Sequence, residues 1–236
     1  MSPRISFSVL AIALFLVGTS AQDHPEEELN SISFGYSGTN GPEKWGSLSP
    51  LFNECSSGKT QSPVDIVKDK VVRNKNLKPL SIDYSPANST LVNNGFNVGM
   101  RYEGDVGVLI ADGKNFSLKQ VHWHSPSEHR INGEQYPTEL HMVHQAADGS
   151  FSVVSILYKY GDADPLLTKI KDQLSELAKE VCAGNEEAHI PVRSISKEQV
   201  EALQAPLYST CKKNARPAQP LNGRQIELYD ELGDHE

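Results

Sequence analysis

Ser117-Leu118-Lys119-Gln120-Val121-His122-Trp123-His124 is the stretch on which the fold assignment rests, since polar and apolar side chains alternate from Gln120 to His124. Side chains of a β-strand point alternately to its two faces. Gln120, His122 and His124 are therefore expected on one face of a strand, with Val121 and Trp123 on the other. Two imidazoles would then point into the same space.

A second strand is expected over Glu139 to Gln145, where the same rule places Glu139, His141 and Val143 on one face. The intervening segment contains the turn pair Asn132-Gly133, which allows this strand to return antiparallel to the first. His141 can then join His122 and His124. Three neutral imidazoles without a carboxylate or thiolate suit a catalytic zinc ion that keeps water in its fourth position.

Two further side chains fit the same site from outside the ligand set. Gln120 and Glu139 lie on the histidine faces and can accept hydrogen bonds from the ring nitrogens that do not bind metal, which fixes the tautomer of each ring. Isolated histidines are usually ordinary strand or core residues. The alternating pair, the third histidine on a partner strand and the two acceptors together favour the metal site.

The other histidines are not expected to be ligands, because His144 falls on the face opposite to His141, His189 lies in a predicted loop, and His24 and His235 are terminal. A different metal site remains open. His122-x-His124 followed by Glu128 matches the pattern of cupins, β-barrels in which Glu128 would bind manganese or iron. The insert Ser125-Pro126-Ser127 interrupts the strand before Glu128, which disfavours that alternative.

The rest of the chain predicts a mainly antiparallel sheet with few helices. Turn pairs Asp112-Gly113 and Asp148-Gly149 separate the later strands. Asp164-Pro165 caps an amphipathic helix that runs toward Val181, and Ser196 with Gln199 forms a capping box for a short helix over Lys197 to Leu203. The other expected strands are Ser81 to Tyr84, Thr90 to Val92, Asn97 to Tyr102, Gly107 to Ile110 and Phe151 to Tyr160, with an irregular segment at Ser31 to Ser62 and an extended one at Arg216 to Ile226.

The 236 residues carry a formal net charge of -8, which leaves no cationic surface for nucleic acid. Arg4 precedes an apolar stretch, Ile5 to Val17, that is too short to span a bilayer and is followed by small residues, so residues 1–21 are expected to be a cleaved secretory signal peptide. No later stretch is long and apolar enough to span a membrane. A single domain over 22–236 is expected, with a core at 30–229 and a frayed acidic tail at 227–236.

Export to the secretory pathway has further consequences. Asn88 and Asn115 begin glycosylation triplets. Disulfides are allowed, but Cys55, Cys182 and Cys211 are an odd number, so each of the three pairings within the chain leaves one thiol over. The expected destination is the cell exterior or cell wall, with the chloroplast by way of the secretory route as the alternative.

These motifs resemble those of the plant-type α-class carbonic anhydrases. The resemblance runs from about Ser31 to Tyr229 and rests on Tyr36, Gly41-Pro42-Glu43-Lys44-Trp45, Gln61-Ser62-Pro63-Val64-Asp65-Ile66, Gln120 to His124, Ser127-Glu128-His129, Glu139 to His144 and Arg216-Pro217-Ala218-Gln219-Pro220-Leu221-Asn222-Gly223-Arg224. It implies an α+β fold that is mainly β: a large, twisted, mostly antiparallel central sheet with a few peripheral helices.

The resemblance also implies an activity and a set of roles. Zinc bound by His122, His124 and His141 would activate a water molecule for the reversible hydration of carbon dioxide to bicarbonate and a proton. Glu128 and the zinc-bound water would be catalytic, with Glu128 orienting that water, while His129 joins Gln120 and Glu139 around the ligands. Val143, Val153, Asn93 and Tyr36 match positions of the substrate pocket.

Two departures from the family pattern put full activity in doubt. Family members have a threonine, in a Ser-Leu-Thr-Thr-Pro-Pro stretch, between the zinc-bound water and the glutamate at Glu128, and this chain has no such stretch. A block is expected to be missing at Arg193/Ser194, which would also remove the usual disulfide partner of Cys55. Phe96 stands where fast members carry a proton-shuttling histidine, and phenylalanine cannot relay a proton.

Two functions therefore follow from the sequence. The first is a zinc-dependent carbonic anhydrase that works slowly in this form, and the second is a carbonic-anhydrase-like binding or storage protein without turnover. Carbon dioxide and bicarbonate are the expected partners of the first. The sequence does not give an oligomeric state.

Overall fold

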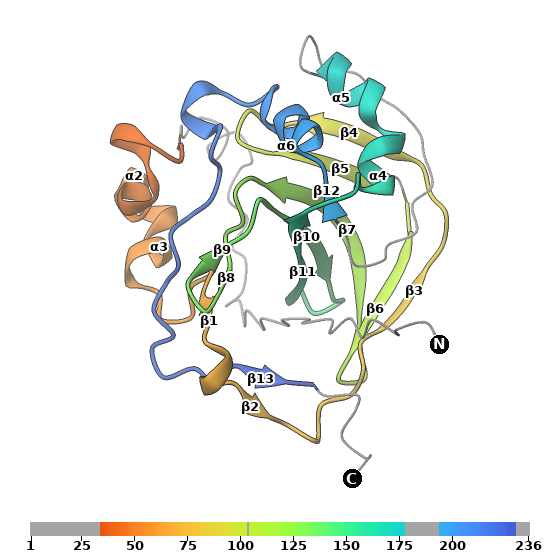
Figure 1. Cartoon of the computed structure of the whole chain (residues 1–236). Helices are drawn as coiled ribbons and strands as arrows, with labels where there is room; N and C mark the ends of the chain where they lie inside the picture. The colour runs from red at the N-terminus through yellow and green to blue at the C-terminus, as the bar shows by residue number, and fades with distance from the viewer. Residues whose placement is uncertain (1–33, 103, 178–193, 230–236) are drawn as a thin grey trace, which may run out of the picture.

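The structure is a computed structural model in which residues 34–102, 104–177 and 194–229 are described. The expected signal peptide, Cys182, His24, His189, His235 and the end of the tail lie outside these residues. Among the described residues the dominant feature is one large curved sheet (Figure 1). Its strands are β3 (Ser81–Tyr84), β4 (Ser89–Asn93), β5 (Val98–Tyr102), β6 (Gly107–Ala111), β7 (Lys114–His124), β10 (Thr138–Gln145), β11 (Phe151–Tyr160) and β12 (Ser194–Ile195).

The order along the main path is β12-β11-β10-β7-β5-β4, and β6 joins β7 to β3. Every pairing in it is antiparallel except β11 with β12. The mostly antiparallel sheet expected from the sequence is thus confirmed. The hairpin between β6 and β7 turns at Asp112 and Gly113, whose φ angles of 49° and 79° are those of the tight turn that an Asp-Gly pair favours.

Two small sheets lie beside the large one. One joins β1 (Asp65–Ile66), β8 (Arg130–Ile131) and β9 (Glu134–Gln135), and the other pairs β2 (Val72–Arg73) with β13 (Glu227–Leu228). The second corrects the expectation of a frayed tail from residue 227, because hydrogen bonds from Val72 N to Ile226 O and from Asn74 N to Leu228 O hold these residues to β2.

The helices differ from the sequence expectation in two places. The helix expected from Asp164 is divided into α4 (Pro165–Lys169) and α5 (Lys171–Leu177), because Ile170 leaves helical geometry with φ -97° and ψ 14°. The irregular segment before residue 62 instead contains short helices. These are η1 (Gly38–Asn40), η2 (Pro42–Lys44), α2 (Trp45–Leu48), η3 (Pro50–Phe52) and α3 (Glu54–Ser57); further single turns are η4 (Lys68–Lys70) and η5 (Ser209–Cys211).

α6 (Lys197–Gln204) begins at the expected capping box, where Ser196 Oγ accepts from Gln199 N and the Gln199 side chain accepts from Ser196 N. The same glutamine binds the cap of α4, since Gln199 Oε1 accepts from Asp164 N at 2.8 Å. The two helices are therefore fixed to each other. Leu167, Leu174 and Leu203 bury their side chains in one apolar core with the sheet.

That core occupies one face of the central strands. Val121, Trp123, Leu140, Met142 and Tyr158 are almost fully buried in it. Because side chains alternate along a strand, the residues between them point to the opposite face. The core thus fixes the direction of Gln120, His122 and His141.

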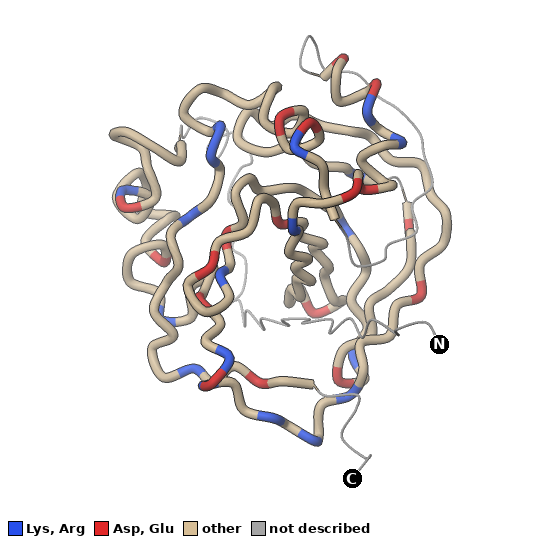
Figure 2. Tube along the Cα trace, viewed as in Figure 1, with Lys and Arg blue, Asp and Glu red and all other residues tan. Residues whose placement is uncertain are grey.

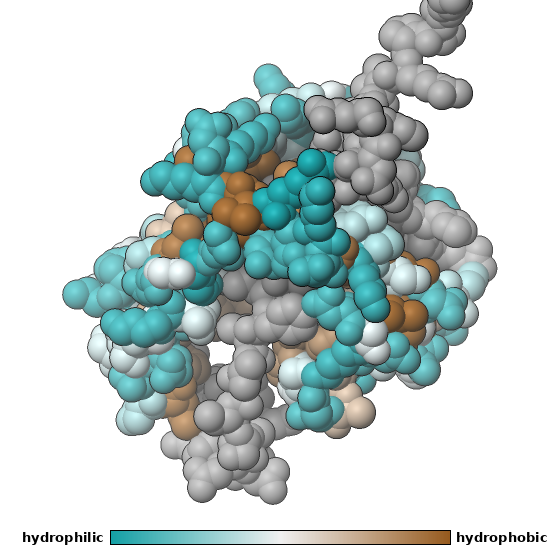
Figure 3. All heavy atoms as spheres, turned by 90° about the horizontal axis from the view of Figure 1, so that it is seen from below, coloured by the Kyte–Doolittle hydropathy of each residue, from teal (hydrophilic) through white to brown (hydrophobic). Residues whose placement is uncertain are grey.

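Charged residues of both signs are interspersed along the described chain (Figure 2). On the face shown in Figure 3, hydrophilic side chains predominate and hydrophobic ones form small separate groups. No helix among the described residues is long and apolar enough to cross a bilayer.

Candidate metal centre

Three histidines converge on the face of the sheet opposite to the core. β7 and β10 pair so that His122 lies opposite His141 and His124 opposite Glu139. The ring centroids of His122, His124 and His141 are 4.7 to 5.1 Å apart. One nitrogen of each ring lies within 4.8 Å of the corresponding nitrogen of the other two, so the three can share one ion.

Each of the three rings has its other nitrogen bonded to an acceptor. His122 Nδ1 donates to Gln120 Oε1 at 2.8 Å, and His141 Nε2 donates to Glu139 Oε1 at 2.7 Å. His124 Nδ1 donates to the backbone carbonyl of Asn214 at 2.5 Å. These bonds leave Nε2 of His122, Nε2 of His124 and Nδ1 of His141 as lone-pair donors.

The Glu139 carboxylate accepts hydrogen bonds from His141 and from the groups that surround it. Its Oε1 also accepts from His129 Nδ1 at 2.6 Å, and its Oε2 accepts from the backbone nitrogens of Glu128 and His129, both at 2.8 Å. Burial raises the pKa of this carboxyl, but the charge of His141 and the hydrogen bonds outweigh it and hold the pKa well below the usual range. Glu139 is therefore an ionised acceptor with every oxygen occupied.

Electrostatics around the rings favour neutral ligands at two positions. Burial lowers the pKa of His122 and of His124. Burial also acts on His141, but the charge of Glu139 outweighs it and raises the pKa of that ring. A bound ion would require the inward nitrogen of His141 to be unprotonated, and Glu139 would hold the proton on the other nitrogen through its hydrogen bond. This donor set, three imidazole nitrogens with oriented rings, fits zinc.

A second group, His129, Glu139 and His141, also has donors within 4.8 Å of one another. Its members are already joined by the 2.6 and 2.7 Å hydrogen bonds through Glu139 Oε1. An ion there would have to break both. The group of three histidines is the better metal site.

Glu128 lies at the edge of the histidine group. Its Oε1 accepts from Arg216 N at 2.8 Å, and its Oε2 is 3.5 Å from His124 Nε2. The group of mutually close donors contains the three histidines and does not include Glu128, which disfavours the cupin-like ligand set.

Three of the four expected pocket residues, Val143, Val153 and Tyr36, lie near the three histidines. Val143 pairs with Gln120 on one side and with Val153 on the other, so both valines lie on the histidine face. The ring of Tyr36 lies edge-on to His124 with centroids 6.5 Å apart. Asn93 is used differently, since its amide donates to Pro206 O and accepts from Gly95 N.

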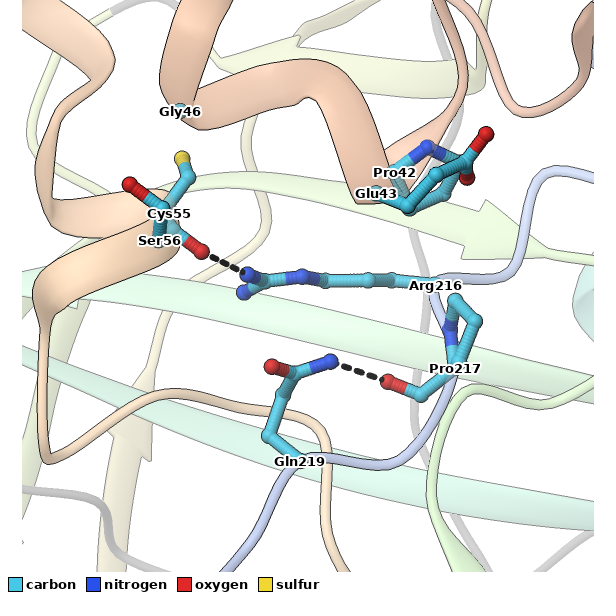
Figure 4. A pocket seen from close by; sticks show the side chains of 8 residues that line it. All are labelled: Pro42, Glu43, Gly46, Cys55, Ser56, Arg216, Pro217 and Gln219. Atoms are coloured by element: carbon cyan, nitrogen blue, oxygen red, sulfur yellow. Dashed lines mark hydrogen bonds between the residues drawn. The ribbon is translucent and has the colours of Figure 1, made fainter.

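Two cavities accompany these groups. One of about 90 Å³ adjoins the centre and is lined by Gln120 and His122 together with Gly99 and Arg101. The other, of about 220 Å³, lies between the N-terminal helices and the segment after Arg216 (Figure 4). There the guanidinium of Arg216 donates to the carbonyl of Cys55 at 2.9 Å, and none of the three histidines lines this cavity.

Asn214 is a residue of the candidate site that the sequence did not reveal. Besides its carbonyl bond to His124, its side chain accepts from Ser125 N and donates to Phe96 O and Trp123 O. Asn214 therefore fixes His124, at the end of β7, to a segment that lies 90 residues later in the chain. A backbone acceptor carries no residue-type signal, and only its closeness to the Arg216 motif could have pointed to it.

Comparison with known proteins gives the same family as these residues. The family model of the eukaryotic-type carbonic anhydrases matches residues 40–193. This chain belongs to that family. Its similarity to plant relatives assigns the chain to the α class of carbonic anhydrases. Alpha carbonic anhydrase 7 of Arabidopsis thaliana is 32% identical to this chain, in an alignment that covers 94% of this chain and 93% of that protein.

Dioscorin DB3L of Dioscorea polystachya is similar too, with 30% identity over 97% of this chain and 96% of its own. Among solved structures, dioscorin complexed with ascorbate superposes with a TM-score of 0.78 at 29% identity, covering 85% of this chain and 99% of that one. The expected fold of a carbonic anhydrase is thus confirmed. The family therefore includes relatives named for the enzyme and relatives named dioscorin.

The comparisons bear on the block expected to be missing. The alignment with the Arabidopsis carbonic anhydrase spans 258 positions, more than the 236 residues of this chain, so that relative carries residues without a counterpart here. The family match ends at residue 193, the last position before β12 and the place expected for the gap.

Proposed function

We propose that this carbonic anhydrase homologue binds one zinc ion through His122, His124 and His141 and interconverts carbon dioxide and bicarbonate, slowly in this form. The observation that carries the proposal is the triple of ring nitrogens left as donors by Gln120, Asn214 and Glu139. When bound by three neutral imidazoles, zinc supplies a Lewis acid that makes water a nucleophile at neutral pH.

The protein's own groups would set the geometry of the reaction. Val143 and Val153 provide an apolar wall beside the histidines, which suits an uncharged, linear substrate. The Glu128 carboxylate, held by the backbone of Arg216, faces His124 and can accept a hydrogen bond from a bound water. Its fixed position favours one orientation of that water.

Two features support a low rate. Phe96 packs against Phe34 with ring centroids 4.7 Å apart and offers no group that could carry a proton outward. The threonine that relays orientation in the family is absent from the sequence around Ser194. A positioning group that is lost or misplaced costs about a hundredfold in rate.

A second candidate function is ligand binding without turnover. The similarity to dioscorin, whose solved structure holds ascorbate, favours this alternative. Both candidates require the same fold, so only activity distinguishes them. Zinc by itself would not, because a bound ion can be retained for structure.

Stopped-flow measurement of carbon dioxide hydration decides between them. The purified chain is compared as loaded with zinc, after removal of zinc by a chelator, and after zinc is returned. We expect hydration above the buffer rate that disappears with zinc and returns with it. A rate equal to buffer in protein with one zinc per chain would leave only the binding function.

We also propose that the chain is exported as a single domain after loss of residues 1–21. Asn88 and Asn115, the expected glycosylation sites, are both exposed, so an oligosaccharide could reach them. Among the described residues, Cys55 and Cys211 are not joined to each other by a disulfide. Mass spectrometry of protein from the secretory pathway would test the signal cleavage, the glycans and any disulfide together.

A further inference from the structure

The cavity of about 90 Å³ beside His122 lies over three neighbouring strands, β4, β5 and β7 (Figure 1). Gly99 is opposite both Val92 and His122, and Arg101 is opposite Gln120. Residues opposite one another in a sheet point to the same face, so these side chains share the face of the metal ligands. The space is open because position 99 has no side chain; a Cβ there would lie 3.3 Å from the Cβ of His122 and 3.7 Å from Val92 Cγ2.

The charge of this cavity is positive. Arg101 is exposed, and none of the described residues that line the cavity is acidic. The carboxylates of the centre are bonded elsewhere, Glu128 to Arg216 N and Glu139 to His129. A guanidinium keeps its charge and has five N–H donors. In a chain with a net charge of -8, Arg101 thus makes this place one where an anion is attracted.

Two side-chain amides add donors to the same wall. Gln120 Oε1 accepts from His122 Nδ1 at 2.8 Å, and Asn97 Oδ1 accepts from Asn94 Nδ2 at 2.7 Å. Each bond occupies the oxygen of the amide, so the NH₂ groups of Gln120 and Asn97 are left for a ligand. Gln120, Asn94 and Asn97 all line the cavity. A ligand with several acceptor oxygens fits this arrangement.

The size of the cavity restricts the ligand further. A water molecule takes about 30 Å³ in the liquid, so the cavity has room for about three waters or for one ion of about four heavy atoms. Bicarbonate, one carbon with three oxygens, is of this size. Its hydroxyl group also needs an acceptor, and Asn94 Oδ1 is the amide oxygen that the bond to Asn97 leaves over.

We propose that this cavity is a bicarbonate subsite beside the metal centre, in which Arg101 pairs with the charge of the ion while Gln120 and Asn97 donate to its oxygens. The subsite is distinct from the metal, because none of these three side chains is a zinc ligand. Binding therefore does not require zinc. Its role in turnover rests on the proposed function: bicarbonate would be held next to His122 before dehydration or after its formation.

Binding is measured on the full chain, with zinc and after its removal, by the line width of carbon-13-labelled bicarbonate as protein is added. We expect saturable binding in both forms. Arg101→Ala should weaken it about tenfold or more, because a charged hydrogen-bond donor is lost. Arg101→Lys, which keeps the charge, should restore part of the affinity. Lys119→Ala is the matched control, since it removes an equal charge from an exposed position of β7 outside the cavity, and it should bind as the unaltered chain does.

Competition by related molecules tests the chemistry of the subsite. Acetate has the charge of bicarbonate but no hydroxyl group for Asn94, and it should displace labelled bicarbonate less readily than unlabelled bicarbonate does. Acetamide has the shape of acetate without its charge and should not displace it. In the zinc-loaded chain, Arg101→Ala should raise KM for bicarbonate dehydration and leave KM for carbon dioxide unchanged.

Four results would each overturn the proposal: equal affinity in Arg101→Ala and the unaltered chain, displacement by acetamide, tighter binding of acetate than of bicarbonate, or binding only when zinc is present. Zinc content shows whether each variant retains the fold. The two proposals fail separately. A chain that binds bicarbonate through Arg101 but hydrates no carbon dioxide would refute the proposed function alone, and an active chain without this binding would refute the subsite alone.

Discussion

At the scale of single residues, the centre depends on which nitrogen of each imidazole is free. Gln120, Asn214 and Glu139 each occupy one nitrogen, so the rings present two Nε2 atoms and one Nδ1 atom to the same point. A ring without its acceptor could rotate or change tautomer. We therefore expect the acceptors to contribute to metal affinity without touching the metal.

Gln120→Ala tests that contribution. Removing the amide frees His122 Nδ1, and we expect the zinc dissociation constant to rise about 10- to 100-fold. Competition with a chromophoric chelator measures it. Lys119→Ala, an exposed position on the same strand, is the control and should bind zinc as the unaltered chain does. Equal affinities for both variants would show that Gln120 does not orient the ring.

His144 gives a pH dependence that is separate from the metal. Its Nε2 accepts a hydrogen bond from the Tyr84 hydroxyl, its Nδ1 donates to Ser152 O at 3.2 Å, and burial lowers its pKa to about 4. Between pH 6.5 and 4 the unfolded chain binds a proton that the folded chain excludes. This contribution to stability is complete above pH 6.5 and is lost as the pH falls toward 4.

We expect the loss to be about 3 kcal/mol in the free energy of unfolding. Urea denaturation of the zinc-free protein at several pH values measures it, and His144→Gln should remove that part of the slope. An equally steep dependence in His144→Gln would assign the effect to other groups.

Much of the residue-level site was visible in the sequence. Alternation along β7 and β10 placed Gln120, His122, His124, Glu139 and His141 correctly on one side because the strand period is strict. The carbonyl of Asn214 was not visible, since main-chain acceptors are the same for every residue and this one comes from a distant segment. The hydrogen bond from Arg216 N to Glu128 was hidden for the same reason.

At the scale of elements, the contact between β5 and β7 holds the first ligand in place. Gly99 lies opposite His122, and a Cβ atom there would be 2.8 Å from Val121 O and 3.3 Å from the Cβ of His122. A side chain would push the two strands apart. Glycine allows them to approach with the imidazole turned inward.

Gly99→Ala should therefore lower the free energy of unfolding by about 1–3 kcal/mol and weaken zinc binding as well. Urea denaturation and chelator competition measure the two effects. The control is Gly35→Ala, whose added Cβ would meet its nearest neighbour at an ordinary 3.5 Å. No change in either quantity for Gly99→Ala would mean that the strands can separate without cost.

Strands were predicted from sequence better than helices. β3 and β11 have the expected bounds, and the other five expected strands, β4, β5, β6, β7 and β10, differ from expectation by at most three residues at either end. The two-residue strands β1, β2, β8, β9, β12 and β13 were not predicted. The break at Ile170 was missed, since apolar spacing continues through it. The short helices before residue 58 were also missed, because single turns have too few residues for a periodic pattern.

At the scale of the whole molecule, the candidate metal centre brings together two strands and a distant segment. β7 supplies two ligands and β10 the third, while β7 is also tied to residue 214. An ion that binds the folded chain and not the unfolded one stabilises the fold by mass action. A bound ion would thus add to the stability of the fold.

Removal of zinc should therefore lower the melting temperature. With free zinc at 100 times its dissociation constant, the stabilisation is about 2.7 kcal/mol, which corresponds to about 5 to 10 °C for a chain of this size. Scanning calorimetry with and without a chelator measures it, and return of zinc should restore the value. Identical melting temperatures would show that the folded chain does not bind zinc.

The extent of the sheet could be predicted only through the family. Periodicity predicts strands one at a time, but it cannot show which residues of the Arabidopsis carbonic anhydrase have no counterpart in this chain. A missing segment leaves no pattern of its own. Only comparison with relatives reveals it.

The convergence of three histidines on one zinc ion is tested most directly by anomalous diffraction at the zinc absorption edge from crystals of the zinc-loaded chain. We expect one peak about 2.0–2.1 Å from Nε2 of His122, Nε2 of His124 and Nδ1 of His141. A peak among His129, Glu139 and His141, or no peak near any of these rings, would contradict it.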